Sequence, residues 1–179
     1  MGGLFGWTRM GFLCAWLLSS AAMASTPFKN SLSSKTNAYM SEGVFTGGKA
    51  GSGSSLLGVR RNFSAKLQLE RVVVEMGDRE AHTGGQTLGF YQASLDSGNH
   101  RIVLDLSQLS LSKVSEAQVQ RLFKNDPYVS SAQLTLDNED KAATLVLNLK
   151  RPVKLEVFQL LKSKMPGRIV MDMTPIGRI

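Results

Sequence analysis

The chain has 179 residues, of which 42% are hydrophobic and 20% are charged, and these are ordinary values for a globular protein. Its formal net charge of +7 favours an anionic partner such as a nucleic acid, an acidic glycan or a lipid surface. The single cysteine, Cys14, lies in an apolar leader, so the rest of the chain excludes disulfides, thiolate nucleophiles and cysteine-bound metals.

Residues 1–24 have the pattern of a secretory signal peptide. A positively charged start precedes an apolar run over residues 10–18, which is too short for a comfortable membrane span. Small residues then lead to Ala24, as signal peptidase requires. We predict cleavage between Ala24 and Ser25, a periplasmic or secreted protein, and no membrane span after processing. An uncleaved membrane anchor is the alternative.

Residues 25–55 are rich in glycine, serine and other polar residues, most densely between Thr46 and Ser55. Such a composition buries too little apolar area to offset the entropy of ordering the chain. We therefore expect a flexible segment here, followed by one folded domain over residues 56–175.

One strand phrase recurs through that domain, with an arginine first, aliphatic residues in alternation and an acid near the end. Strong copies cover residues 71–76, 101–106 and 168–173, and a weaker copy over 144–149 lacks the arginine. Because side chains alternate along a strand, we expect Leu104 and Met171 in the core and Thr144 on the outer face.

The alternation changes phase close to Glu70. Leu67 and Leu69 are odd-numbered core candidates, whereas Val72 and Val74 are even-numbered. A bulge or a short turn at this point would return the apolar side chains to one face.

A single helix is expected directly after Ser115. Ser115 and Gln118 have the spacing of a capping box, and Val119, Leu122 and Phe123 form an apolar stripe. The stripe predicts a helix that covers one end of the sheets. With many short strands and this one helix, the sequence predicts a mainly β protein, an antiparallel β-sandwich of two sheets with one short α-helix.

The sequence offers little catalytic chemistry, and we expect no enzyme, no cofactor and no metal. His82 and His100 have no partner at metal-ligand spacing. Asp105 and Asp172 are the available carboxylate pair, but each follows an arginine by four positions, which favours permanently ionised acids over a proton donor.

The recurrent strand phrase in an exported β-sandwich resembles the AMIN domain family. That family occurs beside the catalytic domain of periplasmic N-acetylmuramoyl-L-alanine amidases and at the periplasmic end of type IV pilus secretins. The resemblance covers roughly residues 56–175 and is best between Tyr128 and Met173. It implies two packed sheets and binding to peptidoglycan or localisation at the cell envelope. The chain departs from the family pattern in two ways: we expect no amidase or secretin domain after residue 175, and the copy at 144–149 lacks its arginine.

The resemblance also implies a polar sheet face that binds the ligand, formed by Arg71, Arg101, Asp105, Arg168 and Asp172. Arginine forks can hold the carboxylates of peptide stems, and acids can accept hydrogen bonds from sugar hydroxyls. The alternative is that these residues form solvated cross-strand ion pairs.

The functional hypothesis is a non-catalytic cell-envelope module that binds peptidoglycan. The alternative is a protein–protein accessory module of a type IV pilus, a secretin or another envelope complex, docking through an exposed sheet edge. A lipid carrier is disfavoured by the charged faces. A nucleic-acid partner is disfavoured by export and by the shortage of aromatic residues in the strands.

Overall fold

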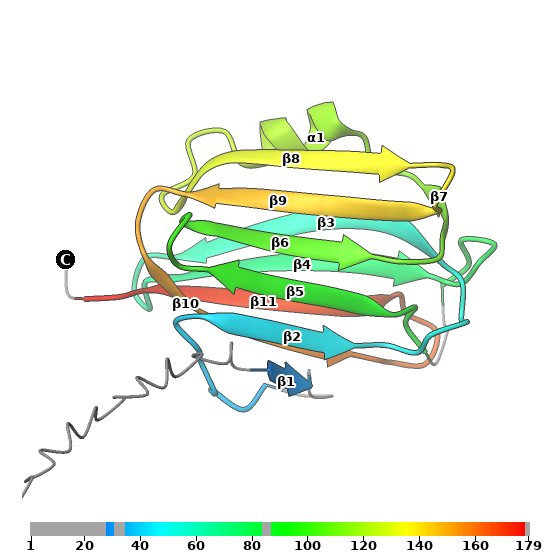
Figure 1. Ribbon diagram of the computed structural model, residues 1–179, viewed down its shortest axis with the longest axis horizontal. Coiled ribbons are helices and arrows are strands. Elements are labelled where there is room, and N and C mark those ends of the chain that lie inside the picture. The colour runs from blue at the N-terminus through cyan, green and yellow to red at the C-terminus, as the bar shows by residue number, and fades with distance from the viewer. Residues whose placement is uncertain (1–27, 31–34, 84–86, 178–179) are drawn as a thin grey trace, which may run out of the picture.

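The computed structural model describes residues 28–30, 35–83 and 87–177, and for residues 28–30 it describes the backbone only. The predicted signal cleavage site at Ala24 and Ser25 lies outside the described residues. Two β-sheets are stacked face to face, with one short helix beside them (Figure 1). The predicted mainly β sandwich with one helix is therefore confirmed.

The two sheets have six and five strands. Sheet A contains, in spatial order, β1 (Phe28–Asn30), β2 (Gly43–Gly47), β5 (Tyr91–Asp96), β6 (Arg101–Leu106), β9 (Ala142–Leu149) and β8 (Val129–Asp137). Sheet B contains, in spatial order, β10 (Val153–Leu160), β11 (Gly167–Pro175), β4 (Leu69–Gly77), β3 (Ser54–Ser64) and β7 (Leu109–Ser112). Neighbouring strands are antiparallel except for two parallel pairs, β1 with β2 and β3 with β7.

The core lies between the sheets and follows from the alternation of the recurrent phrase. In β6 and β11 the inward side chains are aliphatic, and Leu104 and Met171 are both 0% exposed, as predicted. Thr144 on β9 faces outward and is half-buried. Burial of each such aliphatic side chain contributes roughly 1.5–3 kcal/mol, so the repeated phrase supplies much of the drive to form the sandwich.

The phase change before β4 is produced by a short turn over residues 65–68, which joins β3 to β4. Gln68 adopts a positive φ of 48° in this turn. Leu67 is 65% exposed, and Leu69 is half-buried on the face of β4 that carries Arg71, so the expectation that they belong to the core is wrong. The turn removes Leu67 from the alternation, and Glu70 then faces the same way as Val72 and Val74.

The helix α1 (Glu116–Leu122) begins after Ser115 with the predicted capping box. Val119 and Phe123 are buried, and the helix contacts β8 of sheet A and β3 of sheet B (Figure 1). It therefore packs at the side of the sandwich where β8 forms the edge of sheet A. Among the described residues, no helix is long and apolar enough to cross a membrane.

The expected flexible segment over residues 25–55 is partly folded. Residues 43–47 form β2, whose Phe45 is 1% exposed and stands opposite Ala93 of β5. Strand β3 already begins at Ser54, and Ser55 is fully buried. The polar composition of the segment as a whole was misleading, because Phe45, opposite the small Ala93, anchors this short strand in the core.

Candidate functional site

The recurrent phrase places its polar residues on both outer surfaces of the sandwich. Arg71, Arg168 and Asp172 lie on β4 and β11, on the outer face of sheet B. Arg101 and Asp105 lie on β6, on the outer face of sheet A. The expectation that all of them line one polar face is therefore wrong, because strands with the same phrase were distributed to different sheets.

Asp172, on the outer face of sheet B, has two cationic partners. It stands directly opposite Arg71 in the β4–β11 ladder, and it accepts hydrogen bonds from Arg71 Nε at 2.6 Å and Nη2 at 2.8 Å. Lys35 Nζ pairs with the same carboxylate. The Arg71 guanidinium also lies 5.8 Å from the centre of the Phe158 ring.

The charge state of Asp172 follows from these contacts. Its side chain is 0% exposed, and burial by itself would raise the pKa. The hydrogen bonds from Arg71 and Lys35, together with their positive charges, outweigh burial and hold the pKa of Asp172 below its ordinary value. Asp172 is therefore ionised in the folded protein over the physiological pH range.

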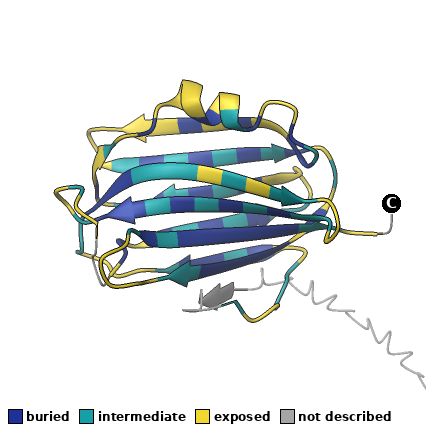
Figure 2. Cartoon of the chain, turned by 180° about the vertical axis from the view of Figure 1, so that it is seen from behind, coloured by how far each residue is buried: buried dark blue, intermediate teal, exposed yellow. Residues whose placement is uncertain are grey.

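Residues 35–40, which we call the strap, cross the outer face of sheet B beside these groups. Oε1 of Glu156 accepts hydrogen bonds from the backbone nitrogens of Thr36 at 2.8 Å and Ala38 at 3.2 Å. At its end the strap pairs with β10, because Met40 and Leu155 exchange backbone hydrogen bonds of 2.9 and 2.8 Å. The strap covers Glu156 and Asp172, which are both buried. Figure 2, seen from the side of sheet B, shows that most of β10 and β11 is buried.

A groove of about 390 Å³ remains open on the same face, outside the strap. This arginine groove is lined by Arg60, Arg61, Asn62, Arg71, Val73, Leu160, Arg168 and Val170. Val73, Val170 and Leu160 supply apolar surface, and Arg60, Arg71 and Arg168 supply guanidinium groups from three neighbouring strands. The Arg61 side chain points inward to Glu70 and Asp126 instead. The arrangement combines apolar contact with cationic hydrogen-bond donors.

Arg168 is the least neutralised arginine of this groove. Glu75 stands opposite it in the ladder, but the Glu75 carboxylate pairs with Arg60. Within the described ranges, Arg168 has no carboxylate at ion-pair distance, and its buried Nε has no hydrogen-bond partner. Its Nη2 lies 3.9 Å from the sulfur of Met165. A buried, unpaired guanidinium N–H carries a desolvation cost that an anionic ligand would remove.

On sheet A, the equivalent residues have local partners. Nε of Arg101 lies 3.4 Å from Oδ2 of Asp96 on the neighbouring strand, and Oδ1 of Asp105 accepts a hydrogen bond of 2.7 Å from Thr144. Arg101 is 48% exposed, so its ion pair is well solvated. These contacts fit the alternative of solvated cross-strand pairs.

A second buried ionic cluster lies on the inward side of β3 and β4, and the sequence analysis missed it. Arg61 Nε lies 3.0 Å from Glu70 Oε1 and 2.9 Å from Asp126 Oδ2. Asp126 Oδ1 accepts from the backbone nitrogens of Tyr128 and Val129, both at 2.7 Å. Burial raises the pKa of Glu70, and the hydrogen bond from Arg61 offsets part of that rise. The cluster ties the chain after α1 to sheet B, which is a structural role.

Sequence patterns gave no direct signal for three other charged residues on or beside sheet B. Lys35, Arg60 and Glu156 lie outside every copy of the phrase. Only the strand register and the path of the strap bring them to Asp172 and Arg168. Among the described residues, no group of three or more His, Cys, Asp or Glu side chains could hold a metal ion.

Comparison with known proteins leaves the family open. No protein-family model matches the chain, and a search of curated proteins finds no match. The features that bear on function are therefore the geometry of the arginine groove and the resemblance of the strand phrase.

Proposed function

We propose that this protein is a non-catalytic, secreted cell-envelope module that binds peptidoglycan through the arginine groove of sheet B. The observation that supports this most is Arg168, whose buried Nε has no hydrogen-bond partner among the described residues and lies in a groove with Val73 and Val170. A site with an unpaired cationic donor and apolar walls suits a ligand that carries both an anionic group and apolar groups.

The peptide stems of peptidoglycan have that chemistry. A stem carboxylate would accept from Arg168, beside Arg71 and Arg60, whose charges are already balanced by Asp172 and Glu75. Aliphatic parts of the stem would lie on Val73 and Val170. Asp172 would orient Arg71 rather than contact the ligand, because the strap covers it.

A non-catalytic role is consistent with the electrostatics of the same face. A glycan-cleaving acid needs a raised pKa so that it can donate a proton near neutral pH. The lowered pKa of Asp172 makes it unsuited to that step. Its fixed negative charge instead holds Arg71 in position.

Co-sedimentation with purified sacculi tests the proposal through a matched pair of variants. Arg168→Gln and Arg101→Gln each remove one charge at the same position of the recurrent phrase, but on opposite faces. We expect about tenfold weaker binding for Arg168→Gln and little change for Arg101→Gln, since only the first lines the groove.

Added salt should weaken binding of the unchanged protein, because charges are screened over about 8–10 Å at moderate ionic strength. Circular dichroism would verify that both variants are folded. Equal losses for the two variants would mean that the basic surface as a whole attracts sacculi, and the groove would then have no special role.

A further inference from the structure

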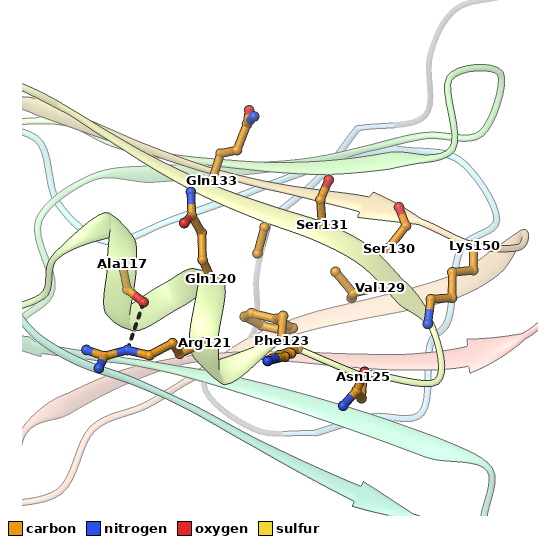
Figure 3. A pocket seen from close by; sticks show the side chains of 12 residues that line it. Ala117, Gln120, Arg121, Phe123, Asn125, Val129, Ser130, Ser131, Gln133 and Lys150 are labelled. Atoms are coloured by element: carbon orange, nitrogen blue, oxygen red, sulfur yellow. Dashed lines mark hydrogen bonds between the residues drawn. The ribbon is translucent and has the colours of Figure 1, made fainter.

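A second hollow, which we call the helix groove, lies between α1 and β8. Its volume is about 820 Å³, and Figure 3 shows the side chains of Gln120, Arg121 and Ser131 around it. Residues 129–133 of β8 line it without interruption. None of the residues suggested by the recurrent phrase belongs to it, so it is independent of the arginine groove.

The strand beside this groove has an edge that pairs with no further strand among the described residues, and α1 packs next to it across the groove. Strand β8 is the last strand of sheet A and, among the described residues, pairs with β9 alone. The register shifts between Val129 and Ser131, so regular pairing with β9 starts at Ser131 and continues to Asp137. An unpaired edge exposes backbone donors and acceptors that a further strand can use.

The side chains of this edge do little to prevent such pairing. Proteins usually protect free edges with lysine, proline or other charged residues. Residues 131–136 contain none of these, and the first charge on the edge is Asp137. Leu136 is 40% exposed near that end. The edge therefore has the composition of a strand that accepts a partner.

The charges around the helix groove indicate what kind of partner fits. Its lining includes the cationic residues Arg121, Lys124 and Lys150 and no acidic residue. Arg121 Nε donates to the Ala117 carbonyl oxygen at 3.2 Å, but within the described chain neither Arg121 nor Lys124 forms an ion pair. Two acids adjoin the lining. Glu116 accepts from Gln120 Nε2 at 3.1 Å, and the buried Asp126 accepts from the backbone nitrogen of Val129 at 2.7 Å.

We propose that β8 binds an extended acidic segment of another protein as an additional strand of sheet A. The backbone of the segment pairs with the edge from Ser131 onward, and its carboxylates lie toward Arg121, Lys124 and Lys150. The free edge supplies the hydrogen bonds, and the three cations select acidic sequences over basic ones.

Fluorescence anisotropy with a dye-labelled seven-residue peptide of alternating valine and glutamate tests this inference. The variant Arg121→Gln with Lys124→Gln should bind about tenfold more weakly than the unchanged protein. The matched control, Lys154→Gln with Lys162→Gln, removes the same charge at the β10 side and should change affinity less than about twofold.

Three further probes separate strand addition from simple charge attraction. A valine–lysine peptide should bind at least about tenfold more weakly, since it meets like charge. The valine–glutamate peptide with all backbone amides N-methylated should not bind, because it cannot pair with the edge. The backbone amide signals of Ser131 and Gln133 should shift when the unmodified peptide is added.

Equal loss of affinity for the two double variants would overturn the inference, and so would amide shifts that avoid β8. Binding of the N-methylated peptide, or of an oligothymidylate of the same charge, as tightly as the unmodified peptide would also overturn it, because the surface would then bind any polyanion.

Discussion

The two outer faces of the sandwich carry the same sequence phrase but differ in environment. On sheet A, Arg101 is 48% exposed and Asp105 is bonded to a threonine. On sheet B, Asp172 is 0% exposed, held by Arg71 and covered by the strap, while Arg168 has no acidic partner among the described residues. One motif thus gives solvated pairs on one face and a buried ion pair beside an open groove on the other.

The difference shows that neighbouring elements decide what a strand motif does. The strap removes Asp172 from water and brings Lys35 to it, and no equivalent segment within the described chain covers Asp105. On β4, Glu75 pairs with Arg60 rather than with Arg168. Burial makes the sheet B contacts costly to break, and screening by water makes the sheet A contacts nearly neutral.

The largest expected effect is a difference in the free energy of unfolding between variants of Asp172 and Asp105. Asp172→Ala removes the buried partner of Arg71 and should lower the free energy of unfolding by about 3–5 kcal/mol. Asp105→Ala on the exposed face should cost less than about 1 kcal/mol. Urea denaturation of both variants measures the two values. Similar losses would show that the strap does not distinguish the faces.

A pH series sharpens the same contrast. The folded-state pKa of Asp172 is lowered, so its contribution is fully present above its unfolded pKa and is lost as the pH falls through the folded value. The stability difference between the unchanged protein and Asp172→Asn should therefore be constant near neutral pH and decrease below about pH 3.9.

Glu70 titrates in the opposite sense, since its folded pKa is raised and its contribution is lost as the pH increases. It is present in both proteins and cancels in the difference. A difference that grows as the solution is acidified would contradict the assigned direction for Asp172.

A smaller effect is expected from the strap itself. Lys35→Gln removes one of the two cations at Asp172 and should reduce the free energy of unfolding by about 1 kcal/mol, because Arg71 remains. Lys49→Gln removes the same charge from an exposed residue after β2 and should be within about 0.5 kcal/mol of the unchanged protein. Thermal unfolding of the two variants makes the comparison, and equal shifts would mean that Lys35 is no better placed than Lys49.

The sequence predicted the sandwich and the helix because alternation and capping are local patterns. Leu104 and Met171 were assigned to the core from period-two spacing alone, and Ser115 was identified as the helix cap. The distribution of the phrase between two sheets could not be predicted, since it depends on which strands pair far apart in the chain. The contacts of Glu156 with Thr36, 120 positions away, are of the same kind.

Only part of the candidate site could be predicted, because long-range strand pairing decides which residues share a face. Arg71 and Asp172 were expected together and do pair, but Arg101 and Asp105 belong to the opposite face. The polar composition of the strap predicts a flexible segment. Its order comes from the backbone bonds of Met40 to Leu155 and of Thr36 to Glu156, which composition does not reveal.

An amide NMR titration with a soluble peptidoglycan fragment that carries a free stem carboxylate tests most directly whether the arginine groove binds peptidoglycan. We predict shifts that centre on Val73, Arg168 and Val170 around the arginine groove, with Arg101 and Asp105 unchanged. Shifts confined to Arg101 and Asp105 on sheet A, or no shifts at saturating fragment, would contradict it.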